Sequence, residues 1–442
     1  MKTVVIVGAD FVPSSLPPAL RIRFFTRHLP EFGWKPVVLT TDPRYYESSI
    51  DPENQRLLPE NLEVIRTPAL EASWTRKFGL GDLGIRSLWH HWQGLQKVCS
   101  ERKVDLVFVP VPPSVPMVLG RLAWNRFRIP YVVDYIDPWV TRYYFTVPRN
   151  QRPPKWWMAH YMAVALEPFA MRHVGHITGV SQGTTDSVVN RYDWLTREDS
   201  TEIPYGGEPA DFDYLRRNPR KNLIFQKQDG LFHLSYVGAV IPAMHGPLRA
   251  LLRAIREGLN GSLELFGRLR VHFAGTTYAR AGAVTHQVLP IAKEMGVEAV
   301  VSESPARVAY LDALQILLDS DATVVLGSDQ PHYTASKLYP YILAGRPMLA
   351  IFHEQSNAID VLRQTRAGHV VPFGSGEAAE AKSELVKGWL AGVLSGTREL
   401  CFPATDWKAF ETYTTRAMAA RLASAFAKGM SKNGAGARAA AN

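Results

Sequence analysis

Near the end of the chain, one segment combines strand and helix patterns in an order that few folds allow. An apolar run at Ala322–Leu326 is followed by a polar loop, a helical segment that ends at Gly345, and a second apolar run at 348–352. Two apolar runs joined through a helix and a glycine turn predict a βαβ unit with parallel strands. A chain that repeats this unit folds into parallel sheets covered by helices.

The start of that helix carries Thr334, Ser336 and Lys337. Thr334 or Ser336 can cap the helix. Backbone N–H groups and the positive end of the dipole would face outward there, which favours a phosphate, and Lys337 adds a cation. The same residues also fit an ordinary surface helix whose lysine is solvated.

Length and composition indicate a folded protein of two or three domains. The chain has 442 residues, of which 46% are apolar and 21% charged. Its net charge of +9 favours anionic partners such as nucleotides, phosphorylated lipids or membrane surfaces. A basic surface without such a partner would give the same balance. Cys99 and Cys401 are too few for a disulfide framework, and no Cys/His spacing suggests a metal site.

Two further features concern location and partners. The first strand pattern begins directly after Lys2, which predicts that there is no signal peptide. No apolar run reaches the roughly 18–20 residues of a membrane span. We therefore expect a cytoplasmic protein. The basic residues are scattered and form no recognised module, so nucleic acid is not an expected partner.

The first half reads as a doubly wound α/β domain. Strands are predicted at residues 3–7, 36–40, 105–109 and 131–133, with a helix at 19–29. In parallel sheets, ligands bind beyond the carboxyl ends of the strands, which here are followed by residues 10–15, 110–114 and 134–139. These loops and the first helix carry the following polar candidates: Ser14, Ser15, Arg21, Asp134 and Asp137.

Asp134 and Asp137 follow one strand closely enough to act as an acid/base pair. The residues by themselves favour a structural interpretation, in which Asp134 caps a turn and Asp137 only precedes a proline.

Two aromatic segments of this half stand outside the sheet pattern. Apolar residues recur at helical spacing over 85–98, just after Trp74 and Phe78. A second helix begins at Lys155-Trp156-Trp157 and continues to about His173. Basic residues beside aromatic ones could form a surface that contacts a membrane, but this pattern more often belongs to helices that pack on their own sheet.

The strand pattern restarts in the second half. Strands are predicted at 233–238, 271–275, 299–301, 323–326, 348–352 and 369–371. Two of them end on glycine, Gly238 and Gly275, where a backbone could approach a ligand closely. We predict domains at 1–205 and 206–400, terminal helices at 401–428 that cross back to the first domain, and a disordered tail at 429–442.

Four segments together resemble the glycosyltransferase family 4 enzymes of the GT-B superfamily. Residues 21–40 (RIRFFTRHLPEFGWKPVVLT) are similar to the first helix and second strand of that family, and residues 131–139 (YVVDYIDPW) to its VVDxRDPW segment. Residues 203–207 (IPYGG) resemble the passage between its domains. Residues 336–347 (SKLYPYILAGRP) are similar to SKLYEYLAAGKP.

The resemblance implies two Rossmann-like domains facing across a cleft, with C-terminal helices. It implies transfer of a sugar from a nucleotide-diphosphate sugar to a glycan, lipid-linked or other hydroxyl acceptor, with retained anomeric configuration and without a metal or other cofactor. Asp137, with Asp134, would serve the reacting centre, and Ser14, Ser15 and Arg21 the acceptor or phosphate side. The implied donor-binding residues are Gly238, His245, Gly275, His332, Thr334, Ser336, Lys337 and Leu338.

The chain departs from the family at several donor-binding positions. His332 and Pro340 stand where the family carries a pair of glutamates that includes the ribose ligand. Ala239 and His245 stand where the family has the arginine and lysine that neutralise the diphosphate. These departures keep two alternatives open: a catalytically inert GT-B scaffold that binds or regulates, and a GT-B sugar-nucleotide epimerase.

Overall fold

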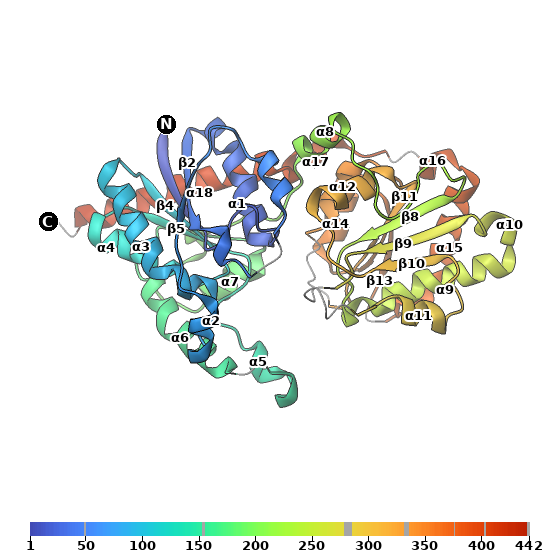
Figure 1. Cartoon of the computed structure of the whole chain (residues 1–442), viewed down its shortest axis with the longest axis horizontal. Coiled ribbons are helices and arrows are strands. Elements are labelled where there is room, and N and C mark those ends of the chain that lie inside the picture. Colours follow the sequence, from blue (N-terminus) through green and yellow to red (C-terminus); the bar gives the residue numbers. More distant parts are fainter. Residues whose placement is uncertain are drawn as a thin grey trace. The chain divides into compact units, whose positions relative to one another are not determined.

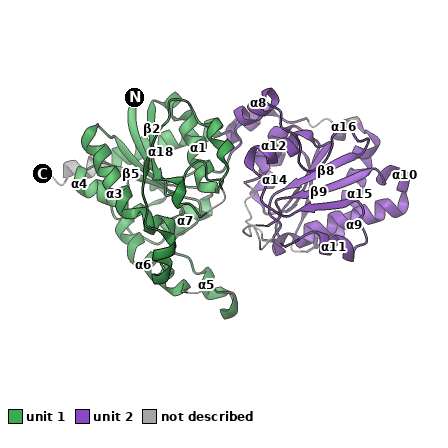
Figure 2. Cartoon of the chain, in the orientation of Figure 1, with its two compact units in different colours: residues 1–205, 415–442 green, residues 206–414 purple. Residues whose placement is uncertain are grey.

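The computed structural model describes residues 1–47, 50–152, 155–277, 285–330, 336–374, 376–401 and 404–439. The chain divides into two compact units, residues 1–205 with 415–442 and residues 206–414 (Figure 2). Both units are parallel sheets covered by helices (Figure 1), so the predicted α/β class is confirmed. No helix in the described ranges combines the length and the apolar character that crossing a bilayer requires.

The first unit contains a seven-stranded sheet in the order β3-β2-β1-β4-β5-β6-β7, with every neighbouring pair parallel. Its central strands are buried on both faces, as their continuous apolar runs predict. The strands are β1 (Lys2–Val7), β2 (Trp34–Thr41), β3 (Glu63–Thr67), β4 (Leu106–Val111), β5 (Tyr131–Tyr135), β6 (His176–Gly179) and β7 (Ser200–Glu202).

Alternate residues of each strand build two separate cores. Val4 and Ile6 pack with helices α1 and α18, whereas Val5 and Val7 pack in the core that α3, α4, α6 and α7 complete. The helices of this unit are α1 (Pro17–His28), α2 (Ala72–Thr75), α3 (Leu83–Glu101), α4 (Met117–Phe127), α5 (Tyr143–Thr146), α6 (Trp156–Met171), α7 (Gln182–Val189) and α18 (Thr415–Ala439).

The C-terminal segment differs from its prediction. Helix α18 continues to Ala439, so the expectation of a disordered tail from 429 was wrong. Phe426 explains how the helix is anchored, since its ring lies 4.9 Å from that of Trp34 and 5.2 Å from that of Phe108. Met430 also packs against this core. The return to the first unit begins at Thr415, whereas the prediction had placed its helices from residue 401.

The second unit contains a six-stranded parallel sheet in the order β10-β9-β8-β11-β12-β13. Its strands are β8 (Phe232–Val237), β9 (Leu269–Ala274), β10 (Val301–Ser304), β11 (Ala322–Leu326), β12 (Met348–His353) and β13 (His369–Phe373). Its helices are α8 (Pro209–Arg217), α9 (His245–Gly261), α10 (Leu263–Phe266), α11 (Leu289–Glu294), α12 (Tyr310–Asp319), α13 (Leu338–Ala344), α14 (Asn357–Thr365), α15 (Ser383–Ser395), α16 (Arg398–Cys401) and α17 (Trp407–Phe410).

Candidate active site

The strand order of each sheet indicates where a ligand would bind. In the second unit the chain winds outward in opposite directions from β8 and β11, and in the first unit from β1 and β4. At such a reversal the loops beyond the two carboxyl ends diverge and leave a crevice for ligands. The loop after β8 begins with Gly238, and the segment after β11 leads to Lys337.

Lys337 turns back from the start of α13 onto the end of β8. Its Nζ donates to the carbonyl of Ala239 at 3.1 Å and lies 3.5 Å from the hydroxyl of Tyr236, above the face of that ring. Within the described part of the chain no carboxylate pairs with this ammonium, and burial lowers its pKa to about 8. Lys337 is therefore a desolvated cation with no counterion among the described residues.

Gly238 makes this position of Lys337 feasible. A Cβ at residue 238 would lie 2.3 Å from Nζ of Lys337, and the backbone there has a φ of +138°. The amide of Gly238 is already bonded to the carbonyl of Ala274 at 2.8 Å. Gly238 thus contributes space for the lysine, whereas the sequence had suggested close approach of its backbone to a ligand. Gly275, with a φ of +72° and its amide bonded to Ser304, is a turn residue.

Two tyrosines that the sequence analysis did not single out hold these parts together. The hydroxyl of Tyr341 on α13 accepts from the amide of Val237 at 2.5 Å and donates to the carbonyl of the same residue. The hydroxyl of Tyr236 donates to the carbonyl of Ala239. Tyr341 belongs to the matched SKLYPYILAGRP segment, which was the available signal, but its partner on β8 could not be read from that segment.

The remaining donor-side candidates have different environments. Helix α13 begins at Leu338, with Lys337 at the capping position and no side-chain cap, so the predicted cap by Ser336 was wrong. Ser336 is exposed, whereas the side chain of Leu338 is buried in the core and presents no polar group. His332 and Thr334 lie outside the described residues.

His245 is the first residue of α9, in the loop region that follows β8. Its Nε2 is buried and has no hydrogen-bond partner among the described residues. The neighbouring loops are joined by a bond from the amide of Asp329 to the carbonyl of Ala243 at 2.8 Å. His245 therefore belongs to the same end of the sheet as Lys337, as the sequence predicted.

In the first unit, Asp134 and Arg21 form a buried ion pair. Nε and Nη2 of Arg21 donate to the two carboxylate oxygens of Asp134 at 2.6 and 2.9 Å, and both side chains are fully buried. Thr178 donates to the same carboxylate, and Nη2 also donates to the carbonyl of Ile203. These partners occupy the carboxylate of Asp134 together with Nε and Nη2 of Arg21, whereas Nη1 of Arg21 is buried and has no hydrogen-bond partner among the described residues. Because both side chains are fully buried and paired with each other, the structure favours a structural role for them over the assignments of Asp134 to catalysis and of Arg21 to a phosphate.

Asp137 has the opposite environment. It lies beyond the end of β5, is exposed, and accepts no hydrogen bond from the described part of the chain. Partial desolvation raises the pKa of its carboxyl above the usual range. Its charge also contributes to raising the pKa of the neighbouring Tyr205 hydroxyl, after the larger effect of burial. Asp137 is thus the carboxylate at this strand end that can contact a ligand.

Ser14 and Ser15 are buried in the loop after β1. The hydroxyl of Ser14 donates to the carboxylate of Asp10 at 2.6 Å, and burial raises the pKa of Asp10. Ser15 is 8% exposed. Both serines therefore belong to the packed loop, and we no longer assign Ser14 to contact with an acceptor.

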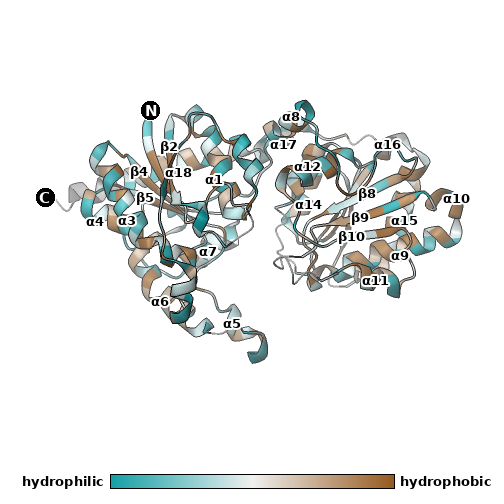
Figure 3. Cartoon of the chain, in the orientation of Figure 1, coloured by the Kyte–Doolittle hydropathy of each residue, from teal (hydrophilic) through white to brown (hydrophobic). Residues whose placement is uncertain are grey.

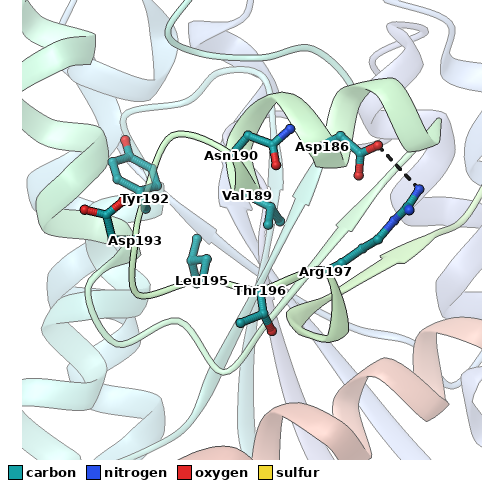
Figure 4. Close-up of a pocket in the computed structure, with 8 residues that line it drawn as sticks. All are labelled: Asp186, Val189, Asn190, Tyr192, Asp193, Leu195, Thr196 and Arg197. Atoms are coloured by element: carbon teal, nitrogen blue, oxygen red, sulfur yellow. Dashed lines mark ion pairs between the residues drawn. The ribbon is translucent and has the colours of Figure 1, made fainter.

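A hollow elsewhere in this unit lies apart from the strand ends described above. It has a volume of about 410 Å³ and is lined by residues between Asp186 and Arg197 (Figure 4). These residues connect the end of α7 to the start of β7, which places them at the amino end of the sheet. An ion pair at 3.6 Å joins Asp186 to Arg197 across its exposed rim. The hollow brings none of the predicted site residues together.

Comparison with protein families finds a match within the first part of the chain. Residues 18–206 match the family model described as the glycosyl transferase 4-like domain. This match contains the β5 segment with Asp137 and the α1 segment with Arg21. No curated protein matches the sequence at a significant level.

Solved structures resemble the chain over almost its full length. Sucrose-phosphate synthase from Thermosynechococcus elongatus has a TM-score of 0.60 at 13% identity, with 97% of this chain and 99% of that chain covered. HepE from Anabaena in complex with UDP-glucose has a TM-score of 0.59 at 12% identity, with coverage of 97% and 100%. The UDP-forming trehalose-phosphate synthase from Burkholderia xenovorans has a TM-score of 0.57 at 12% identity, with coverage of 96% and 99%. These similarities establish the GT-B fold.

Proposed function

We propose that this chain, which has the GT-B fold and matches a glycosyl transferase 4-like domain, is a glycosyltransferase that uses a nucleotide-diphosphate sugar. The donor is bound by the second unit and the hydroxyl acceptor by the first. The HepE structure contains UDP-glucose, which makes uridine diphosphate the first nucleotide to test. The acceptor is a glycan or a lipid-linked hydroxyl compound, and the reaction takes place in the cytoplasm.

The single observation that carries this proposal is the unpaired ammonium of Lys337. A buried cation without a counterion is costly, and a bound anion relieves that cost. A nucleotide diphosphate supplies the anion, and the switch point of the β8–β11 sheet is where such ligands bind in open α/β folds. His245, with its buried ring nitrogen, is placed to donate a second hydrogen bond.

The proposed mechanism uses charge stabilisation by the protein. As the bond between the sugar and the diphosphate breaks, negative charge grows on the leaving phosphate, and Lys337 stabilises it more strongly in a desolvated site than it would in water. The acceptor oxygen forms the new bond to the anomeric carbon as the diphosphate leaves, and Asp137 accepts the proton of the acceptor hydroxyl. The proposal includes no metal and no other cofactor, nominates no protein nucleophile, and keeps the anomeric configuration of the sugar.

Replacement of Lys337 by methionine should weaken UDP binding by about 1.5–3 kcal/mol, the range for a hydrogen bond to a charged group. In the unmodified protein, UDP affinity should fall as the pH rises above about 8, because the free ammonium then loses its proton. Titration calorimetry over this pH range measures both effects. Lys408→Met, at an exposed position of the same unit, is the control. Equal affinity in the Lys337 and Lys408 variants would remove Lys337 from the site.

Replacement of Asp137 by asparagine should reduce turnover at least about a hundredfold, the range for loss of an acid/base group. The fold should remain intact, since the side chain is exposed. Release of UDP from a UDP-sugar in the presence of acceptor measures turnover, and circular dichroism checks the fold. Asp193→Asn, also exposed in this unit, is the control. Turnover equal to that of the control would exclude Asp137 from the reaction.

A specific observation supports a second candidate, an inert GT-B scaffold. Ala239, where the family carries an arginine, is buried at the end of β8 and brings no charge to the site. Thermal shift with UDP, GDP and ADP separates the two functions, because a donor enzyme is stabilised by the nucleotide that it binds. If none of them raises the melting temperature, the scaffold is supported and the transferase is not.

A further inference from the structure

Helix α6 is apolar around its whole circumference, yet most of it is not buried. Its sequence, WWMAHYMAVALEPFAM, has Glu167 as its only charged residue. The buried residues of this helix are Ala163 at its middle and Glu167, Ala170 and Met171 in its second half. Trp157 is 54% exposed and Tyr161 is 66% exposed. A helix that is apolar on every side is normally surrounded by apolar material, and the fold supplies it on one side alone (Figure 3).

Two neighbouring segments extend this exposed aromatic surface. On α5, the ring of Phe145 lies 5.0 Å from those of Trp156 and His160, and Phe145 is itself 52% exposed. The short helix η4 (Arg76–Phe78) ends at Gly79, where a Cβ would lie within 3.4 Å of Lys155 and Met158. Figure 1 shows α2, α5 and α6 at the same end of the first unit. We call this the α5–α6 surface.

Along the α5 and α6 segments, the charge of the α5–α6 surface has a single sign, whereas Arg76 of η4 forms an ion pair with Glu47. Residues 138–166 contain no carboxylate, and they contain four cations: Arg142, Arg149, Arg152 and Lys155. Arg152 lies over the ring of Trp156 at 5.2 Å, which places a guanidinium directly beside the apolar residues. Tryptophan and tyrosine next to arginine and lysine are the residues enriched where a protein meets lipid headgroups.

We propose that the α5–α6 surface binds the headgroup region of an anionic lipid bilayer. Trp157, Tyr161 and Phe145 enter the boundary between headgroups and acyl chains, and the four cations contact lipid phosphates. The positive charge of residues 138–166 favours an anionic bilayer over a protein partner, whose interface would also present carboxylates to match. This surface is independent of the donor site, so the proposal does not depend on transferase activity.

Sedimentation of the full chain with vesicles tests the proposal without any nucleotide. The vesicles contain phosphatidylcholine alone or phosphatidylcholine mixed with phosphatidylglycerol. The unmodified chain should bind the mixed vesicles at least about tenfold more tightly, and added salt should weaken that binding. The double variant Trp157→Ser with Tyr161→Ser should bind the mixed vesicles about tenfold or more weakly than the unmodified chain does. Trp407→Ser, 50% exposed in the second unit, is the matched control and should bind normally.

A second variant keeps the test independent of any folding defect. Arg142→Gln with Arg149→Gln changes two exposed side chains and should lower affinity for the mixed vesicles about tenfold while binding to phosphatidylcholine stays the same. The proposal is overturned if the unmodified chain binds neither kind of vesicle, which is the result expected if this surface binds a protein partner instead. Equal losses in the Trp157 and Trp407 variants would also overturn it.

Discussion

Replacement of Arg21 by methionine is expected to lower the free energy of unfolding of the first unit by about 3–5 kcal/mol. The variant leaves the carboxylate of Asp134 buried without its cation, and Thr178 is the one remaining donor to it in the part of the chain that the structure describes. It also removes the donor to the carbonyl of Ile203. An uncompensated buried charge costs far more than a lost surface contact, because no water can take the place of the guanidinium. Urea unfolding followed by tryptophan fluorescence measures the change.

Two further variants identify the source of this loss. Arg416→Ala removes an ion pair with Glu31 that has the same 2.6 Å distance but exposed partners, and should cost under about 1 kcal/mol. Adding Asp134→Leu to Arg21→Met removes both charges and should recover much of the stability. If Arg21→Met unfolds at the same urea concentration as Arg416→Ala, the buried pair does not have the structural role assigned to it.

This pair also shows which part of the site the sequence could not reveal. Asp134 and Asp137 are equivalent in the linear motif, and the motif offered both as catalytic. Successive side chains of β5 point to opposite faces, so Asp134 shares the face of Val132, toward the core that α1 completes. Its partner Arg21 lies 113 positions earlier in the chain. A contact of that separation depends on the folded topology, and no local pattern predicts it.

The fold could be predicted from the sequence more completely, because the patterns that indicate it are local. Each central strand is a short apolar run, and this pattern by itself predicts a parallel sheet buried on both faces. The C-terminal tail was predicted wrongly because its structure depends on contacts that are not local. Its alanine- and glycine-rich composition resembles a disordered segment, but Phe426 and Met430 continue the apolar side of α18 against the sheet. Tertiary packing there determines the helix more strongly than composition does.

On the donor side, the structure shows where the predicted residues lie, while their part in binding a donor stays a prediction. Lys337, Gly238 and His245, which the resemblance had grouped, lie at one end of the second sheet. The resemblance did not show that Gly238 serves to admit the side chain of Lys337, because that relation depends on a distance between two loops. The family carries a charged arginine where this chain has Ala239. The replacement matters for the same reason, because Lys337 bonds to the backbone carbonyl of Ala239.

Acidification from pH 6.5 to about 4 is expected to destabilise the first unit strongly, through two buried histidines. Burial lowers the pKa of His91 to about 3 and that of His176 to about 4, whereas both titrate near 6.5 once unfolded. Below pH 6.5 the unfolded chain binds protons that the folded unit does not, so stability falls with pH. The loss is up to about 3 kcal/mol per histidine across this window, against a typical total of about 5–15 kcal/mol.

The variant His91→Gln isolates one of these contributions. Glutamine can keep a polar contact to Thr41, whose hydroxyl lies 3.1 Å from Nε2 of His91, but it takes up no proton. Its stability should therefore depend less steeply on pH than that of the unmodified chain, as measured by urea unfolding at pH 7.5, 6, 5 and about 4. Gln93→Asn, at an exposed position of the same helix, is the control and should leave the slope unchanged, because neither side chain binds a proton.

The pH dependence has to be compared between variants, because the carboxyl of Asp10 in the same unit changes the stability in the opposite direction. Burial raises the pKa of Asp10, so the folded unit takes up that proton before the unfolded chain does, and stability gains on acidification. The profile of the unmodified chain is the sum of both effects. Subtracting the His91→Gln profile cancels the contribution of Asp10 and leaves that of His91. If the difference between the two profiles is constant from pH 7.5 to about 4, His91 is not held neutral by burial.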